Sequence, residues 1–167
     1  MTSFMHKTAM EFARTAVPQP LMTPPPAFRR WEVFVVANGG CMLFLFIGVG
    51  GAMGALARHG LITWINSRAG TAFPWGTLTV NLIGSFLIGA LMGYVGTSPM
   101  SPALRTLLAV GLLGSFTTFS TYALETVSLV RDGFAMRAAI YAFGSLVLGA
   151  AAVCAGLFSV VQSVGAR

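Results

Sequence analysis

The chain has 167 residues, of which 56% are hydrophobic and only 8% are charged, and its mean hydropathy is +0.80. Since a soluble domain carries roughly 25% charged residues, this composition excludes an ordinary soluble fold and predicts a small integral membrane protein. The net charge of +6 does not indicate nucleic-acid binding, because the basic residues stand singly near the ends of apolar runs, as is usual in membrane proteins.

Residues 1–41 differ from the rest of the chain. The stretch "AVPQPLMTPPPAFRRWE" is proline-rich and indicates an extended or disordered tail. It lacks the apolar core and small-residue cleavage site of a secretory signal. Met42 would make a normal start for the first membrane span, so a genuine tail and a start codon assigned too far upstream both stay open. We assign the tail no function and predict that residues 42–167 form the functional domain.

Four apolar stretches are long enough to cross the roughly 30 Å hydrocarbon layer, which takes about 20 residues. The first starts at Met42, or upstream near Val33, and is expected to run to Ala57, where Arg58 and His59 stop it. The other three are expected at 74–95, 105–131 and 138–161. The short loops between them predict an all-α, multi-pass membrane protein with four transmembrane helices packed as a compact bundle.

Two pairs of glycines have the spacing of close helix contacts in lipid. Gly50 and Gly54 stand four apart in "GGAMGA", and Gly89 and Gly93 repeat this spacing in "GALMG". Small residues at such positions let helix backbones approach closely. Tight packing leaves little room for water, so any ion path through the bundle is expected to be narrow.

The arginines near the span ends give only a weak signal for orientation. One side is expected to hold Arg29, Arg30, Arg105 and Arg167, and the other Arg58, Arg68, Arg131 and Arg137. If translation starts at Met42, the count becomes two against four. Because orientation follows the imbalance of Lys and Arg, this weak bias predicts that the chain can insert either way up.

Acidic residues are nearly absent from the spans. Glu125 is the only carboxylate within one, and Asp132 lies at a helix end. Neither has a partner for acid–base catalysis, and no serine–histidine–acid set can be assembled with His59, so we predict that the protein is not an enzyme. A different class of membrane protein, a small four-helix proton-coupled exporter, would need a buried carboxylate in its first span, and residues 33–57 contain none.

The third span contains "LLGSFTTFSTYALE", which is polar without basic charge. Five hydroxyls fall within seven residues: Ser115, Thr117, Thr118, Ser120 and Thr121. Gly111 and Gly114 precede the threonine pair and weaken the helix, so we expect this helix to break in its middle. Broken helices at membrane depth are tolerated only where the freed backbone groups find protein, water or an ion. Backbone carbonyls exposed by the break could hold a small cation.

Phe119 and Tyr122 are three residues apart, so their rings are expected to share one helix face. Aromatic rings are positive at their edges. Together with Asn81 of "WGTLTVNLIG" and hydroxyl donors, these edges could line an anion path without a full positive charge that would hold the ion too tightly. The alternatives, aromatic core packing and Asn81 as a hydrogen-bonding link between helices, stay open from the residues alone.

The combination of "GGAMGALARHG", "GTLTVNLIGSFLIG" and "GLLGSFTTFSTYALE" resembles the Fluc (CrcB) family of fluoride channels, over about residues 42–162. The resemblance implies a fluoride-specific channel in the cell inner membrane that exports the anion passively. It also implies an antiparallel, dual-topology homodimer with two fluoride pores and a central structural sodium ion. The expected partners are therefore fluoride, a second copy of the chain and the lipid bilayer.

The resemblance also implies a set of pore residues. Asn81 matches the pore asparagine, Phe119 matches the first pore phenylalanine, and Tyr122 stands where the family has a second phenylalanine. The next hydroxyl expected after Ser145 falls on Gly149, so the polar track of the fourth helix is expected to be shortened. The full set expected to line the fluoride pore is Asn81, Phe119, Ser120, Thr121, Tyr122, Tyr141 and Ser145.

The remaining expectations from the resemblance concern the cation and the charged residues. The sodium ion is expected on the backbone carbonyls of Gly114 and Thr117 of each subunit, and a Cβ at Gly114 is expected to clash with the helix break. Arg58 matches the arginine that ends the first helix. Glu125 is interpreted as a vestibule or structural residue.

Overall fold

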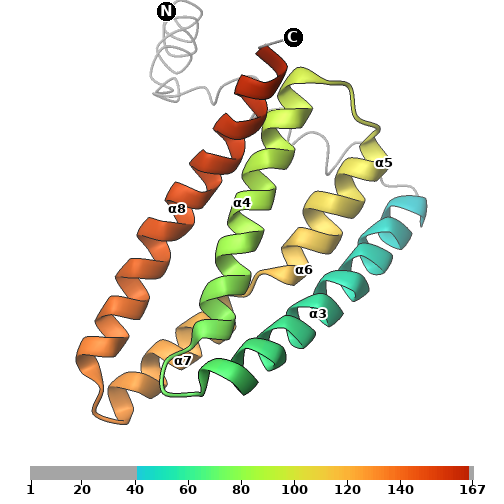
Figure 1. The fold of residues 1–167 in the computed structure, drawn as a ribbon. Coiled ribbons are helices and arrows are strands. Elements are labelled where there is room, and N and C mark those ends of the chain that lie inside the picture. The colour runs from blue at the N-terminus through green and yellow to red at the C-terminus, as the bar shows by residue number, and fades with distance from the viewer. Residues whose placement is uncertain (1–40, 166–167) are drawn as a thin grey trace, which may run out of the picture. The chain divides into compact units, whose positions relative to one another are not determined.

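The computed structural model describes residues 41–165, so all but the last residue of the predicted proline-rich tail lies outside the described residues. The elements in chain order are α3 (Cys41–Ala69), α4 (Trp75–Thr97), α5 (Pro102–Arg105), the π-helix η1 (Thr106–Leu113), α6 (Gly114–Phe116), α7 (Phe119–Arg131) and α8 (Ala135–Gly165). The prediction of four membrane-spanning helices is confirmed in number and order (Figure 1): Met42–Ala69, Trp75–Thr97, Pro102–Arg131 and Ala135–Ser163 are long and apolar enough to cross a membrane.

The first helix is longer than predicted. α3 continues through Arg58 and His59 to Ala69, so the prediction that these two residues end the first helix was wrong. Their charge ends the apolar run, but neither residue breaks a helix, and arginine is among the better helix formers. The helix ends only at Gly70, whose φ of +75° is a conformation that favours glycine. Arg58 therefore lies within a helix and not at its end.

The predicted break in the third membrane helix is confirmed. α6 ends at Phe116, and the next two residues are extended, with φ/ψ of −81°/157° at Thr117 and −147°/115° at Thr118. α7 then begins at Phe119. β-branched residues are restricted at χ1 in a helix and favour extended backbone, so the threonine pair suits this position. The break divides the third span into two unequal segments (Figure 1).

The glycine pairs lie at helix contacts, as their spacing predicts. A Cβ at Gly50 would meet the carbonyl oxygen of Leu107, and one at Gly54 would meet that of Leu112, both in η1. On α4, a Cβ at Gly89 would meet the carbonyl oxygen of Val153 in α8. Glycine is needed at these three positions because the neighbouring backbone occupies the space that a side chain would take.

Replacing Gly89 with valine is expected to destabilise the folded subunit severely. The new Cβ would overlap the backbone of Val153, which cannot move aside as a side chain can, and overpacking of a tight contact costs about 1–3 kcal/mol or more. Size-exclusion chromatography of the detergent-solubilised protein should show loss of the folded species. Gly96→Val is the matched control on the same helix, because a Cβ there meets nothing within 4 Å. Equal yields of folded protein from both variants would contradict this packing.

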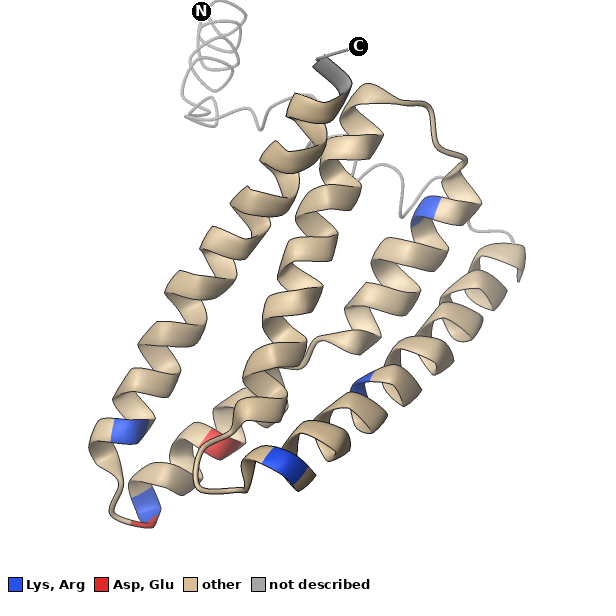
Figure 2. Cartoon of the chain, in the orientation of Figure 1, with Lys and Arg blue, Asp and Glu red and all other residues tan. Residues whose placement is uncertain are grey.

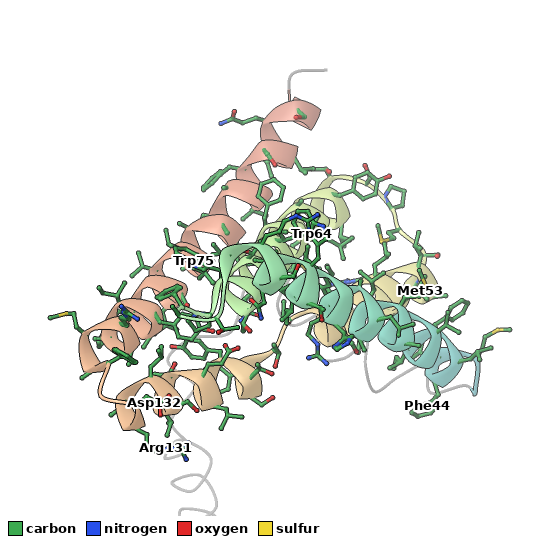
Figure 3. The ribbon with its side chains drawn as sticks, turned by 60° about the horizontal axis from the view of Figure 1, so that its bottom comes forward. Phe44, Met53, Trp64, Trp75, Arg131 and Asp132 are labelled. Carbon is green, nitrogen blue, oxygen red and sulfur yellow. The ribbon has the colours of Figure 1, made fainter. Side chains whose placement is uncertain are left out.

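The outer surfaces of the helices carry large apolar side chains, as expected where lipid replaces water. Phe44 and Met53 project from α3, and Trp75 stands at the start of α4 (Figure 3). Basic residues lie at the end of the bundle where α3 ends and α8 begins (Figure 2). Most charged residues in the described range therefore lie near helix ends. Arg58 in α3 and Glu125 in α7 are exceptions, because they lie within a helix.

Candidate functional site

The side chain of Asn81 binds the backbone of the broken helix at Thr118. The N–H of Thr118 donates to Oδ1 of Asn81 (2.8 Å), and Nδ2 of Asn81 donates to the carbonyl oxygen of Thr118 (3.1 Å). One amide side chain from α4 thus pairs with both polar backbone groups of a residue that is 6% exposed. The interpretation of Asn81 as a link between helices is therefore correct for these two contacts. Its second Nδ2–H stays available, because a primary amide has two donors.

The carbonyls of Gly114 and Thr117 are among those that lose their usual helical donors at the break. In a continuous helix the N–H of Thr118 would reach the oxygen of Gly114, and the N–H of Thr121 would reach that of Thr117. Here the first N–H donates to Asn81, and the second donates to Oγ1 of Thr118 (3.2 Å), which caps α7. The carbonyls of Gly114 and Thr117 are the two groups predicted as cation ligands.

A cation at the break would rest on backbone oxygen. Within residues 41–165, no group of three or more His, Cys, Asp or Glu side chains is placed to hold a metal ion. Hard cations prefer oxygen ligands, and the two carbonyls described above supply them. The donor set is chemically suited to a sodium ion.

Gly114 does not have the steric role that the sequence suggested. A Cβ built there meets only the carbonyl oxygen of Ala109, at an ordinary contact distance of 3.6 Å. The expected clash with the break is therefore wrong within one subunit, because the chain turns away from Gly114 and leaves it exposed. Any requirement for glycine at this position has to come from outside the subunit.

The two aromatic rings after the break lie side by side, as their spacing predicts. The ring centroids of Phe119 and Tyr122 are 5.6 Å apart, and the planes are tilted by 43°. Phe119 is 76% exposed on the subunit, so it is not a core residue. The hydroxyl of Tyr122 donates to the carbonyl oxygen of Ala142 in α8 (3.0 Å). That hydroxyl is engaged as a donor, which leaves the ring as the part of Tyr122 that can act on an anion.

Glu125 joins three helices. Thr77 of α4 donates to Oε1 (2.8 Å), and Tyr141 of α8 donates to Oε2 (2.7 Å). Both donors are only 1% exposed, so the carboxylate of α7 is held by two buried hydroxyls. Charge-assisted hydrogen bonds of this kind are stronger than neutral ones. This geometry suits the structural interpretation of Glu125, and it occupies the hydroxyl of Tyr141 as a donor.

Two predicted hydroxyls, those of Ser145 and Thr121, keep donor capacity. Oγ of Ser145 is buried and has no hydrogen-bond partner within the described chain. Leaving a buried hydroxyl unpaired costs about 1–3 kcal/mol, so such a group calls for an explanation. Oγ1 of Thr121 accepts from Thr118 (3.0 Å), and the exposed Ser120 lies 3.4 Å from the same Thr118 hydroxyl.

Arg58 lies on α3 and forms no ion pair with any residue of the described range 41–165. No ion pair is formed between residues that the structure describes, and Glu125 is held by the two hydroxyls above. The guanidinium is thus a positive charge partway along a membrane helix, a position where charged groups are usually functional.

Thr77 and Thr118 belong to the site, although the predicted set contains neither. Thr77 lies four residues before Asn81, hence on the same face of α4, and that spacing could have identified it. Thr118 was recognised only as one of several hydroxyls. Its role as a helix cap could not be assigned without knowing that α7 begins at Phe119.

The amino-acid sequence is similar to those of other named proteins. The profile of the family described as CrcB-like protein, Camphor Resistance (CrcB), matches residues 45–157. A protein of Thermus thermophilus named fluoride-specific ion channel FluC is 46% identical over 110 residues, which cover 66% of this chain and 87% of the relative. Proteins with the same name from Hahella chejuensis and Rhizobium meliloti are 43% and 44% identical, each over 114 residues that cover 68% of this chain and 90% and 91% of the relative.

Proposed function

The chain belongs to the CrcB-like family, and from this membership we propose that it is a fluoride-specific ion channel that lowers cytoplasmic fluoride by passive export. Hydrogen fluoride enters a cell as a neutral acid and dissociates in the cytoplasm, where the anion is trapped. A channel in the inner membrane returns the anion to the outside down its gradient.

The observation that carries this proposal is a set of neutral donors that stay unpaired in the described chain, together with the neighbouring rings of Phe119 and Tyr122 after the helix break. The second N–H of Asn81 and the buried hydroxyl of Ser145 have no partner in the described chain, and Phe119 presents its ring on the same segment as the helix break. Burying even a carboxylate-sized ion costs on the order of 20 kcal/mol by an idealised Born estimate. Many weak donors and positive ring edges can offset that cost without trapping the ion.

The functional unit in this proposal is an antiparallel homodimer. Phe119 is 76% exposed and Gly114 is exposed, so a pore ring and a proposed cation ligand both lie where a second copy can cover them. Because Arg58 lies inside α3, it no longer counts among the arginines at span ends. If translation starts at Met42, the count expected from the sequence is three at one end (Arg68, Arg131 and Arg137) against two at the other (Arg105 and Arg167). A difference of one residue suits a chain that inserts in both orientations.

A structural sodium ion at the dimer centre is the proposed cofactor. The carbonyls of Gly114 and Thr117 would hold it, two from each subunit, because the break takes away their helical donors. A bound cation would neutralise the partial negative charge of four convergent carbonyls and fix the break in place. The fluoride path uses the other side of the same segment, where donors and ring edges lie.

The charged residues have separate proposed roles. Glu125 ties α4, α7 and α8 together through Thr77 and Tyr141. Arg58 raises the local concentration of anions at the vestibule, because its charge has no counter-ion among the described residues. A proton-coupled exporter is not supported, since the only carboxylate within a span lies on the third span and is held by two hydroxyls, and the named relatives are channels.

The dual-topology proposal is tested by fixing the orientation. Adding several lysines at one end of the subunit should force all copies into a single orientation and abolish fluoride efflux, because antiparallel pairs can no longer form. Coexpression with a copy that carries lysines at the opposite end should restore efflux. Full efflux from one orientation-locked form alone would exclude the antiparallel dimer, while leaving a fluoride channel of another assembly possible.

A further inference from the structure

α4 and α8 run side by side in a constant register. Oγ of Ser85 lies 3.7 Å from the position of a Cβ on Gly149, and further along the same helices Gly89 lies against Val153. The offset along the chain is the same in both pairs. Gly93 and Leu157 continue it by one more turn. Such a register means that residues four apart on α4 meet residues four apart on α8.

The same offset aligns two polar pairs, one beside Glu125 of α7 and one at the helix break. It matches Thr77 with Tyr141, whose hydroxyls hold the two oxygens of Glu125. One turn further it matches Asn81 with Ser145, which brings the spare N–H of the amide level with the buried unpaired hydroxyl. Four residues of helix rise by about 6 Å, so these two levels are roughly 6 Å apart.

The same offset matches Ser85 with Gly149 as a third level, one turn beyond Asn81 and Ser145. This level differs from the first two because α8 contributes no side chain there. Gly149 stands at the position where the family resemblance leads one to expect a hydroxyl, and Ser85 faces it from α4. Ser85 is half-buried and makes no hydrogen bond within residues 41–165. Serines in membrane helices can bond back to their own helix, as Ser159 does with the carbonyl oxygen of Gly156 (2.8 Å).

We infer that Ser85 is a fluoride-binding residue, which supplies from α4 the hydroxyl that Gly149 lacks on α8. The inference rests on the proposed fluoride channel function and names one further contact of that same path. The donors at successive levels are then the amide of Asn81 with the hydroxyl of Ser145, and about 6 Å further the hydroxyl of Ser85. The polar track is not shortened at Gly149 but moves to the neighbouring helix.

The absence of a side chain at Gly149 is what keeps this hydroxyl available. A serine at 149 would stand in contact with Ser85, and the two hydroxyls would satisfy each other. With glycine there, the hydroxyl of Ser85 points toward space that no other group within 4 Å of that Cβ position fills. No carboxylate lies at this level to attract a cation instead, since Glu125 is two levels away and already bonded.

The test is fluoride efflux from proteoliposomes, measured with a fluoride electrode, for Ser85→Ala beside the parent. The efflux rate is expected to fall about tenfold, because a hydrogen bond to a charged group is worth at least that factor. Folding should be unaffected, since the parent serine makes no hydrogen bond in the described chain. The matched control is Ser159→Ala, whose hydroxyl only bonds its own helix and whose efflux should match that of the parent.

A second variant separates an anion contact from a packing role. Ser85→Ala with Gly149→Ser moves the hydroxyl from α4 to α8, where its Cβ has room, and should restore most of the lost efflux. If Ser85→Ala conducts like the parent, Ser85 is not on the path. If the double variant stays as slow as the single one, the loss came from packing, and the inference is wrong. If the parent itself releases no fluoride, the proposed function fails first and this inference falls with it.

Discussion

Replacing Phe119 with isoleucine is expected to reduce fluoride efflux by about thirtyfold while the protein stays folded. Isoleucine keeps an apolar side chain of similar bulk but has no positive ring edge. Contacts between a desolvated ion and an aromatic ring are worth about 2 kcal/mol where they have been measured for cations, and an anion at the ring edge meets the opposite pole of the same quadrupole. The measurement is electrode-detected efflux from proteoliposomes at equal protein density.

Stability is not expected to change much in Phe119→Ile. The side chain is 76% exposed on its own subunit, and its ring contact there is with Tyr122, at 5.6 Å between centroids. Tyr122→Phe is the matched control, because it keeps the ring and removes only the hydrogen bond to Ala142. That control should lose about 1 kcal/mol of stability and conduct nearly as well as the parent. Unchanged efflux in Phe119→Ile would show that ring edges do not carry the anion.

Replacing Asn81 with leucine is expected to have the largest effect, because it removes both efflux and stability. The substitution leaves the N–H and the carbonyl of Thr118 without the partners that the amide provides. Each unsatisfied buried group costs about 1–3 kcal/mol, so the free energy of unfolding should fall by at least about 2 kcal/mol. Thermal unfolding of the purified protein measures that loss, and efflux should be undetectable.

Asn66→Leu is the control for the chemical change itself. Asn66 also accepts from the backbone of another helix, at the N–H of Gly76 (3.2 Å), but it lies at the end of α3 and away from the break. Efflux should survive this substitution. If Asn81→Leu were as stable as Asn66→Leu, then Asn81 would not hold the break, and its role would be confined to the path.

The membrane spans and the break could be predicted because both depend on local sequence. Four apolar runs set the helices, and the glycines before Thr117 and Thr118 weakened the third one where it does break. The spacing of three residues alone predicted that the rings of Phe119 and Tyr122 lie on the same helix face. Each of these features needs information from only a few neighbouring residues, which a single sequence provides.

The hydrogen-bond partners could not be predicted, because they join residues far apart in the chain. Tyr141 and Tyr122 were expected to line the fluoride pore, but the sequence could not show that their hydroxyls donate to Glu125 and to Ala142. The end of α3 was misplaced because a change in polarity was taken for the end of a helix. A helix ends where its backbone changes conformation, which here is at Gly70.

The two proposed carbonyl ligands are available because the N–H groups that would bind them in a continuous helix bind other oxygens. The type of residue that carries each carbonyl does not decide this. Any residue at 117 has a carbonyl, but only a cap such as Thr118 takes the N–H of Thr121 away from it. The resemblance to a known family pointed to two carbonyls that do lose their helical donors. Residue chemistry alone would have favoured side-chain ligands, which the described chain does not assemble.

Fluoride release from proteoliposomes loaded with potassium fluoride tests the channel function most directly. With the purified protein in the membrane, adding a potassium ionophore should start rapid release of fluoride without any pH gradient, because passive movement of an anion needs only a compensating cation. Vesicles without protein should retain their fluoride. Release that required a proton gradient would indicate a coupled exporter, and no release from vesicles containing the folded protein would contradict a fluoride channel altogether.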